Sequence, residues 1–411
     1  MKLKDFARRL SLVAAVTLAA ALALVPTAAA GAKFRILHNF TGGNDGSGPQ
    51  LFAALAMDAG GNLYGAAGGG SGTNCDHAGC GVVFEMVRGA GGKWSENVIY
   101  QFTNWQSADS PLTPDSQGSL YGCTQEYGPM FELTPGVGQW TFIPIWQYGC
   151  GGPVGLILDG AGDLYGAFGN NSSGGISELS PTSRGWVYTN LYEFCPSGVN
   201  CRDGQTPLAP FSWDAQGNLY GTTWSGGLVN YPDCGGYCGV AFQLAHNGDG
   251  TWTYHVMHRF DSFKGDGYLP YGGLTVDASG NAYGTTTHGG PYYRGTVFRL
   301  TQAKTGHWKE TILYDFPYNV VPAAPGNDLV FDKSGNLYGA ADGNNCNYGC
   351  GVVFKLTPQK SGKWKCTVLH QFNWTDGTYP NGLTMDSQGH LYGTTTGGGK
   401  YGYGVVFEIT P

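Results

Sequence analysis

The sequence predicts an all-β fold, a seven-bladed β-propeller with four-stranded antiparallel blades. Two observations support this prediction. One eight-residue motif occurs seven times along the chain, and a strand-like segment that is missing after the last copy stands alone before the first. The closest copies begin at Asp115 and Asp159 and the most distant neighbours at Asp214 and Asp277, a period typical of propeller or solenoid repeats.

The motif itself, D-x-x-G-N-L-Y-G, predicts a strand, a tight turn and a second strand. Its aspartate can accept hydrogen bonds from the backbone ahead of it, and its first glycine allows a positive φ. The residues that follow, Leu-Tyr-Gly-Thr-Thr in the clearest copies, favour extended structure. The seven copies begin at Asp58, Asp115, Asp159, Asp214, Asp277, Asp332 and Asp386.

Two further strands follow in each period, which completes a four-stranded blade. The third strand has the pattern G-V-V-F-x-L, and the fourth runs from a tryptophan to a phenylalanine. Third strands are expected at Gly81 to Met86, Gly239 to Leu244, Gly295 to Leu300, Gly351 to Leu356 and Gly404 to Ile409. Fourth strands are expected at Trp94 to Phe102, Trp252 to Phe260, Trp308 to Phe316 and Trp364 to Phe372.

The ends of the repeat array predict how the ring closes. The seventh repeat stops at Pro411 with no fourth strand, whereas Phe34 to Phe40 has the fourth-strand pattern with no repeat before it. If Phe34 to Phe40 pairs with Val405 to Ile409, it completes the last blade and removes two open sheet edges.

Residues 1–30 are expected to be a signal peptide, and residues 31–411 a single propeller domain. Basic residues precede an apolar run, and Thr27 to Ala30 resembles a cleavage site. The chain is therefore expected to be secreted or to reside in the periplasm or cell envelope, with no membrane span after cleavage. Only 12% of residues are charged and the net charge is −7, so nucleic acid and anionic membranes are not expected partners.

Eleven cysteines in an exported chain predict disulfide bonds. Several are close in sequence, and three such pairs precede the third strands of different blades. The spacings and the lack of nearby histidines argue against zinc, so no metal site is expected. The proposed pairs are Cys75 with Cys80, Cys195 with Cys201, Cys234 with Cys238, Cys346 with Cys350 and Cys123 with Cys150, which leaves Cys366 unpaired.

These motifs together resemble the GloVer tandem repeat of bacterial exported proteins, often called choice-of-anchor proteins. The resemblance covers roughly residues 34 to 411 and rests on D-x-x-G-N-L-Y-G-T-T, G-V-V-F-x-L-T-P and W-x-x-x-x-L-Y-x-F. The family implies no established activity and no cofactor.

Histidines and acids supply no catalytic signature in the sequence. His38, His258 and His370 stand two residues before the last Phe of a fourth strand, where other blades have Tyr or Trp, so packing is the expected role. Asp-Gly pairs in the connections between blades, at Asp45, Asp203, Asp266 and Asp376, are expected to form turns, with a calcium or polar-ligand site as the alternative.

Aromatic loop residues give the sequence's main functional hypothesis. The connections between blades and the loops between second and third strands should share one face, where exposed rings suit sugars or a protein partner. This favours a binding or scaffold module for a glycan or for an envelope or extracellular protein. The alternatives are a carbohydrate-active hydrolase or lyase at the central channel mouth and a purely structural surface component. The candidate ligand-binding residues are Trp105, Trp224, Tyr231, Tyr292, Tyr293, Trp374 and Tyr401.

Overall fold

The computed structural model describes the repeat region with several gaps. The described residues are 31–49, 54–69, 80–103, 107–108, 110–124, 128–147, 150, 155–168, 173–228, 238–262, 265–317, 324–343 and 350–411. The expected signal peptide, residues 1–30, lies outside them. Apart from one 3₁₀ turn, η1 (Ala90–Gly92), the regular structure in this part of the chain is β-strand.

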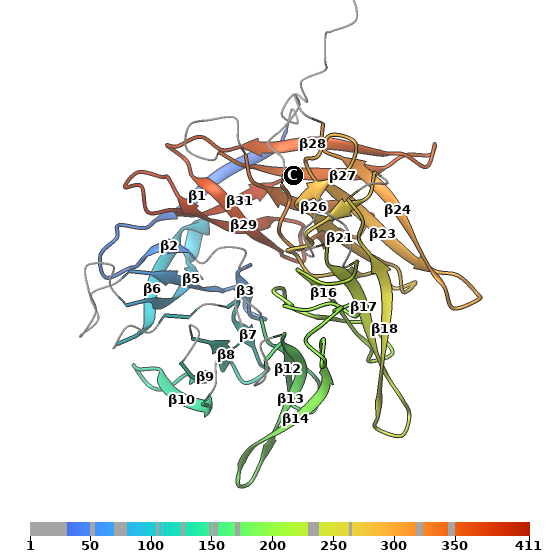
Figure 1. The fold of residues 1–411 in the computed structure, drawn as a ribbon. Coiled ribbons are helices and arrows are strands. Elements are labelled where there is room, and N and C mark those ends of the chain that lie inside the picture. Colours follow the sequence, from blue (N-terminus) through green and yellow to red (C-terminus); the bar gives the residue numbers. More distant parts are fainter. Residues whose placement is uncertain are drawn as a thin grey trace, which may run out of the picture.

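The described residues form seven four-stranded antiparallel blades around one axis, and the colours of Figure 1 follow the chain around the disc. Blade 1 consists of β3 (Ala56–Met57), β4 (Leu63–Gly68), β5 (Val82–Arg88) and β6 (Trp94–Gln101). Blade 2 consists of β7 (Thr113–Pro114), β8 (Leu120–Cys123), β9 (Met130–Thr134) and β10 (Thr141–Trp146). Blade 3 consists of β11 (Ile157–Leu158), β12 (Leu164–Gly166), β13 (Gly175–Thr182) and β14 (Gly185–Glu193).

The remaining blades repeat this order. Blade 4 consists of β15 (Ser212–Trp213), β16 (Leu219–Thr223), β17 (Val240–His246) and β18 (Trp252–Arg259). Blade 5 consists of β20 (Thr275–Val276), β21 (Ala282–Thr286), β23 (Thr296–Gln302) and β24 (Trp308–Asp315). Blade 6 consists of β25 (Val330–Phe331), β26 (Leu337–Ala341), β27 (Val352–Pro358) and β28 (Trp364–Gln371). Blade 7 consists of β29 (Thr378–Met385), β30 (Leu391–Gly397), β31 (Val405–Thr410) and β1 (Lys33–Asn39). Short strands β2 (Ser47–Pro49), β19 (Gly267–Tyr268) and β22 (His288–Gly289) lie in the connections and loops.

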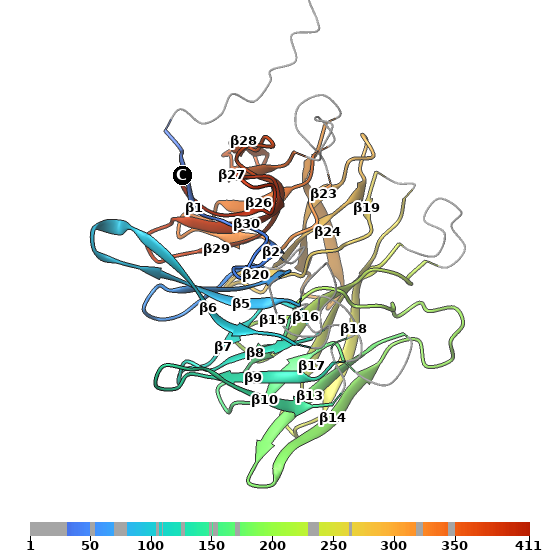
Figure 2. The same ribbon diagram turned by 90° about the vertical axis from the view of Figure 1, so that its left-hand side faces the viewer.

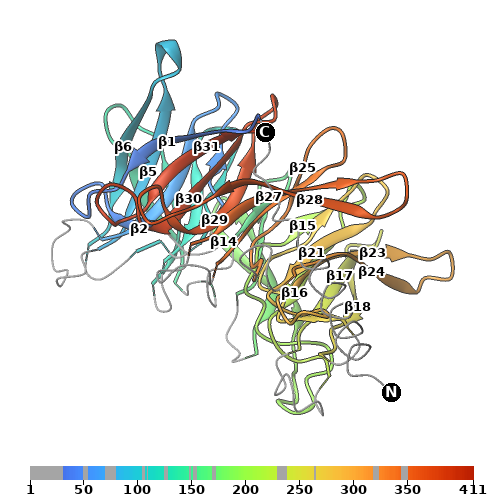
Figure 3. The same ribbon diagram turned by 90° about the horizontal axis from the view of Figure 1, so that it is seen from above.

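The first and last strands close the ring, as the sequence predicts. β1 pairs with β31 in antiparallel register, with Phe34 opposite Ile409 and Asn39 opposite Val405. Figure 1 shows the blue β1 beside the red strands of blade 7, and Figures 2 and 3 show the same neighbourhood from two other directions. Blade 7 is therefore built from both ends of the repeat array. β1 covers the edge of β31 that would otherwise be unpaired.

The repeated motif is held by its own side chains. In blade 4, Asp214 Oδ1 accepts the backbone N–H groups of Gln216 and Asn218 at 2.9 Å. Its Oδ2 accepts the Asn218 amide at 2.7 Å and the Tyr220 hydroxyl at 2.9 Å. The equivalent tyrosine hydroxyl reaches the turn aspartate at 2.9 to 3.4 Å in five other blades. The motif therefore keeps Asp, Asn and Tyr together because they form one hydrogen-bonded unit.

The glycine after that tyrosine makes room for the blade core. A Cβ at Gly65 would lie 2.4 Å from the Phe84 ring and 2.8 Å from Leu55. The same clash with a third-strand phenylalanine recurs in five other blades, at Gly122, Gly221, Gly284, Gly339 and Gly393. Each of these phenylalanines is fully buried, so the glycine lets an inner strand and a third strand approach across a closely packed core.

Each fourth strand carries a β-bulge at the same place. The register shifts by one residue directly before the ring residue that stands two positions ahead of the terminal phenylalanine, or ahead of Tyr148 in blade 2. The skipped residue is always aliphatic: Leu37, Ile99, Ile145, Leu191, Met257, Leu313 and Leu369. A bulge re-aims the side chains that follow it, and here it directs the ring residue toward the next blade.

No helix in the described part of the chain has the length and apolarity that a transmembrane span requires. Two disulfides lie fully within the described residues, Cys123–Cys150 and Cys195–Cys201, both as proposed from the sequence. Cys80, Cys238 and Cys350 are also disulfide-bonded. Their proposed partners, Cys75, Cys234 and Cys346, lie outside the described residues. Cys366 is a free thiol.

Candidate functional site

The connections between blades and the loops between second and third strands share one face of the disc. β19, in the connection that enters blade 5, pairs with β22 in the second-to-third loop of the same blade. Ala108 and Thr124 form the same kind of bridge at blade 2, and Gln205 and Ser225 form it at blade 4. We call this surface the loop face.

Four exposed aromatic side chains project from two adjoining loops of blade 7. Trp374 is 47% exposed, Tyr379 41%, Tyr401 49% and Tyr403 46%. The first two lie in the connection that enters the blade and at the start of β29, and the other two lie between β30 and β31. We call these four side chains the blade-7 rings.

The two loops that carry the blade-7 rings are tied together by their backbones. The Gly399 N–H donates to the Trp374 carbonyl at 3.0 Å. A Cβ at Gly402 would lie 3.9 Å from the Trp374 ring, so the indole lies over that glycine. The Lys400 ammonium is 4.9 Å from the Tyr401 ring centroid, close enough for a cation–π contact. The two loops therefore form a single preorganised surface.

Blade 5 presents a second, smaller aromatic group on the loop face. Tyr292 is 48% exposed and Tyr293 is 71% exposed. Tyr293 has a φ of +55°, which is unusual for a bulky residue, and its N–H donates to the Gly290 carbonyl at 3.1 Å. A residue held in this conformation by a turn presents its ring outward at a cost in backbone strain.

The remaining candidates from the sequence are placed differently. Trp224 is half-buried, with its ring 6.1 Å from the ring of Tyr271, and its backbone N–H donates to Thr206. It packs at the base of the loop face and does not project from it. Trp105 and Tyr231 lie outside the described residues.

The histidines and the Asp-Gly turns form one structural unit. His38 Nε2 is 3.1 Å from Asp45, His258 Nε2 is 2.8 Å from Asp266, and His370 Nε2 is 3.2 Å from Asp376. Tyr192 takes the same place and donates to Asp203 at 2.8 Å. The same aspartates accept backbone N–H groups at the ends of the fourth strands. Each carboxylate thus anchors a connection to the strand before it, as expected of a turn.

Ring residues also form the contacts between neighbouring blades. We define a blade seam as the contact between this ring residue and the residue two positions after the tryptophan of the next blade. The rings stack at four seams: Tyr100 on Phe142, Trp146 on Tyr188, Tyr192 on Tyr254 and His370 on Phe34. At the seam between blades 5 and 6, burial and the neighbouring Cys366 raise the pKa of Tyr314.

The two other seams contain a glutamate. At the seam between blades 4 and 5, His258 Nε2 lies 3.6 Å from Glu310 Oε2 and 2.8 Å from Asp266 Oδ2. Burial raises the pKa of Glu310 to about 8, with a further upward effect from Asp266 and Asp315. Burial acts to lower the pKa of His258, but its hydrogen bond to the Asp266 carboxylate and the charge of Glu310 outweigh this effect, so the net shift is upward. At the seam between blades 7 and 1, burial and Asp45 raise the pKa of Glu96 to about 7.

Small residues close the centre of the disc. The position before the large apolar residue of each inner strand is occupied by Ala54, Pro111, Gly155, Pro210, Gly273, Asp328 and Gly382. A Cβ at Gly155 would lie 2.9 Å from Pro210 and 3.4 Å from Pro111, and one at Gly382 would lie 2.9 Å from Ala54. These residues form an axial ring.

Asp328 is the one ionisable member of the axial ring. Its Oδ1 accepts the Gly273 N–H at 2.5 Å, and burial raises its pKa to about 6. A hydrolase or lyase site at the channel mouth would need at least two converging groups, and the seven positions of the ring supply one.

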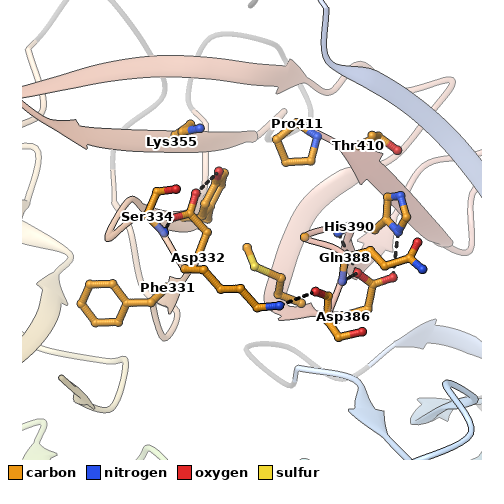
Figure 4. A pocket seen from close by; sticks show the side chains of 14 residues that line it. Phe331, Asp332, Ser334, Lys355, Asp386, Gln388, His390, Thr410 and Pro411 are labelled. Carbon is orange, nitrogen blue, oxygen red and sulfur yellow. Dashed lines mark hydrogen bonds and ion pairs between the residues drawn. The ribbon is translucent and has the colours of Figure 1, made fainter. Parts of the chain in front are cut away.

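The opposite face of the disc has clefts between neighbouring turns. A cleft of about 390 Å³ lies between blades 6 and 7, and Lys333 crosses it to donate to the Ser387 carbonyl at 3.0 Å (Figure 4). Asp386 Oδ1 accepts two backbone N–H groups and its Oδ2 contacts His390 and Tyr392. The carboxylate is thus committed to its own turn. A similar cleft of about 360 Å³ lies between blades 3 and 4. These clefts arise wherever two repeated turns lie side by side. The hydrogen bonds of Asp386 and Lys333 hold the turns themselves, so we do not assign a catalytic or binding role to the clefts.

Sequence comparison agrees with the repeat pattern. A family model described as the Gloeobacter/Verrucomicrobia repeat matches residues 125–347 and 309–411, which is more than half of the chain. The chain belongs to this repeat family. The resemblance drawn from the motifs is therefore confirmed. A comparison with curated proteins gives no match.

Solved structures similar to this Gloeobacter/Verrucomicrobia repeat protein share its fold. Virginiamycin B lyase from Staphylococcus aureus is 12% identical, with a TM-score of 0.53 over 92% of this chain and 99% of that chain. A protein from Lactobacillus plantarum is 11% identical, with a TM-score of 0.49 over 85% of this chain and 89% of that one. The likeness to virginiamycin B lyase, at 12% identity, shows the β-propeller fold alone, because one fold supports many functions.

Proposed function

We propose that this propeller is an exported glycan-binding module and that the blade-7 rings form its binding surface. One observation carries the proposal. Every tryptophan, tyrosine or phenylalanine side chain that is exposed among the described residues lies on the loop face, four on blade 7 and two on blade 5. A random surface would scatter such rings over all the strands.

The chemistry of the blade-7 rings suits a sugar. The apolar C–H face of a pyranose packs against a flat ring, while its hydroxyl groups need polar partners around the ring. Trp374 and Tyr401 supply flat surfaces, and Asn373, Thr375 and Lys400 supply polar groups in the same loops. Exposed rings in polar surroundings mark binding sites more often than isolated surface apolar groups do.

Preorganisation strengthens this proposal. The hydrogen bond from Gly399 to the Trp374 carbonyl fixes the two loops relative to each other before any ligand arrives. A ligand then binds without a large loss of loop entropy, which favours affinity for small, polar molecules.

Export supports a glycan ligand. The basic and apolar character of residues 1–30 predicts a signal peptide, and disulfides such as Cys123–Cys150 persist in oxidising compartments. Polysaccharides are abundant in the envelope and outside the cell. The alternative of catalysis at the central channel lacks a comparable basis, because Asp328 is the single ionisable group of the axial ring.

A glycan array with the purified full-length protein tests the proposal. We expect binding to one class of pyranose-containing glycan, weakened at least tenfold in the double variant Trp374→Ala/Tyr401→Ala, since truncated aromatic anchors typically cost about 2 kcal/mol or more. The matched control is Ile143→Ala/Val187→Ala, which removes two exposed apolar side chains from fourth strands away from the loop face.

Three results would overturn the proposal. They are no glycan binding by folded wild-type protein, equal binding by the double variant, and an equal loss in the control. Capture of a protein partner that depends on Trp374 and Tyr401, without any glycan binding, would show that the surface serves protein recognition instead.

A further inference from the structure

We propose that His258, Asp266 and Glu310 form a binding site for a divalent transition-metal ion of the zinc class at the seam between blades 4 and 5. The site is separate from the blade-7 rings and independent of the proposed glycan function. The cysteine spacings and the positions of the histidines predict no metal site, and no ligand-spacing motif links His258, Asp266 and Glu310.

The geometry brings three ligand atoms together from three segments. His258 lies on β18, Asp266 lies in the connection that follows, and Glu310 lies on β24 of the next blade. One ligand atom from each lies within 4.8 Å of the other two. Ligand atoms around one zinc ion are about 3.3 Å apart when the bonds are about 2.0–2.1 Å long. The separations from His258 Nε2, 2.8 Å to Asp266 and 3.6 Å to Glu310, bracket that spacing.

The surroundings favour a positive ion between these side chains. The side chains of His258, Asp266 and Glu310 are 23%, 8% and 15% exposed, so water screens their charges poorly. Glu310 Oε1 is buried and has no hydrogen-bond partner among the described residues. Asp315 acts on Glu310 as an additional negative charge. A divalent cation would balance the carboxylates and give a partner to the one Glu310 oxygen that the described residues leave unsatisfied.

The ligand set selects the class of metal. One imidazole nitrogen with two carboxylate oxygens suits zinc and similar borderline ions, whereas Ca²⁺ and Mg²⁺ prefer all-oxygen sites. Three protein ligands leave a fourth position for water.

The repeats provide an internal comparison. His370 and Asp376 repeat the His–Asp pair at 3.2 Å, but Phe34 stacks on that histidine at 3.7 Å and takes the place of the glutamate. At the seam between blades 7 and 1, Glu96 is present beside His38 and Asp45, yet within the described residues only the His258 group meets the three-ligand spacing. The His–Asp pair belongs to the general turn, and the close approach of Glu310 is what distinguishes this seam.

Zinc binding by the tag-free, full-length protein tests the proposal. After treatment with EDTA and its removal, we expect native mass spectrometry to show one specific Zn²⁺ per chain, and titration calorimetry to show tight binding of Zn²⁺ with no comparable binding of Ca²⁺. Glu310→Gln and His258→Gln should each weaken the affinity by at least about 100-fold, the upper end of what the loss of outer-shell partners costs in zinc sites.

Two controls are expected to keep wild-type affinity. His370→Gln makes the same change at the seam without a glutamate. Cys366→Ser removes the free thiol, which is the obvious competing zinc ligand. Circular dichroism checks that each variant folds, and the near-isosteric Glu310→Gln keeps the test valid if His258→Gln does not fold. The proposal is wrong if the wild-type protein binds no Zn²⁺, if Glu310→Gln binds it normally, or if Cys366→Ser abolishes binding. The proposal is also wrong if the free energy of unfolding changes with pH but not with added Zn²⁺. That result would show that Asp266, His258 and Glu310 form a hydrogen-bonded group without a metal.

Discussion

Arg35 and Glu408, which are 373 residues apart in the chain, form an ion pair across β1 and β31. The Arg35 guanidinium also donates to the Gly92 carbonyl in the turn between β5 and β6 of blade 1, at 3.1 Å. One side chain at the front of the repeat array therefore touches the last blade and the first. The closure of the disc depends on this strand.

Phe34→Ala should destabilise the whole disc, although the residue lies near one end of the domain. The ring is half-buried, stacks on His370 at 3.7 Å and contacts Phe372 and Phe407. We expect a loss of about 2–3 kcal/mol in the free energy of unfolding, somewhat less than for a fully buried phenylalanine. Lys33→Ala, an exposed change on the same strand, should cost less than about 0.5 kcal/mol. Denaturation in guanidinium chloride measures both, and equal effects would contradict the closure argument.

Gly65→Ala should be destabilising by about 1–3 kcal/mol, the usual range for an overpacked core. The added methyl group would lie 2.4 Å from the Phe84 ring and 2.8 Å from Leu55, so the inner and third strands of blade 1 would have to separate. Gly160→Ala is the matched control, because a Cβ there meets nothing within 4 Å. Thermal unfolding should separate the two variants clearly. An unchanged midpoint for Gly65→Ala would mean that the motif glycine serves the turn and not the core.

Tyr192 allows the two roles of a seam residue to be separated. Its ring stacks on Tyr254 at 3.9 Å and its hydroxyl donates to Asp203 at 2.8 Å. Tyr192→Phe keeps the stack and loses the hydrogen bond, so we expect a cost of about 1–2 kcal/mol. Tyr192→Ala loses both and should cost about 3 kcal/mol or more. Chemical denaturation of both variants measures the difference. If phenylalanine is as damaging as alanine, the stacked rings contribute little to holding blades 3 and 4 together.

Asp328 predicts a pH dependence of unusual sign. Burial raises its pKa to about 6 in the folded protein from the ordinary value of 3.8. Between these values the unfolded chain has lost a proton that the native protein keeps, so this carboxyl makes the fold less stable as pH rises from about 4 to 6. Relative to Asp328→Asn, whose amide oxygen can still accept from Gly273, the wild-type protein should lose about 1–3 kcal/mol across this window.

The matched control for this titration is Asp249, an exposed carboxyl whose pKa is lowered mainly by hydrogen bonds from Thr251. A lowered pKa stabilises the fold above the unfolded value, so the difference between wild type and Asp249→Asn should change in the opposite direction as pH rises. Calorimetric unfolding between about pH 2 and 7 measures both pairs, because the Asp249 difference develops below the ordinary carboxyl pKa of 3.8 and the Asp328 difference develops above it. A flat difference for Asp328→Asn would refute the raised pKa.

Sequence reasoning reached most of the fold because the repeat encodes its own contacts. Asp214, Asn218 and Tyr220 lie within one turn, so their spacing reveals the hairpin that they stabilise. The sequence also predicts the pairing of β1 with β31, because the chain has an extra fourth strand before the first repeat and lacks a fourth strand after the last one. Local periodicity and strand counting are enough for both.

The seams and the axial ring could not be predicted in the same way. Glu310 meets His258 because the next blade is placed beside it, and no local pattern relates residues in different repeats. Trp224 shows that the exposure of a loop residue also cannot be predicted from its sequence position. Its loop position predicts exposure, but packing beside Tyr271 half-buries it. Exposure is decided by the neighbours that the fold supplies and not by the segment that carries the residue.

The pairing of β1 with β31 in blade 7 also sets an order of events during synthesis. β1 emerges before any of its partners and can pair only when β31, at the far end of the repeat array, has been made. The loops that carry Trp374 and Tyr401 belong to this same final blade. A chain interrupted before the last repeat would lack blade 7 and its exposed rings, so the proposed recognition would be confined to molecules whose translation has run through that repeat.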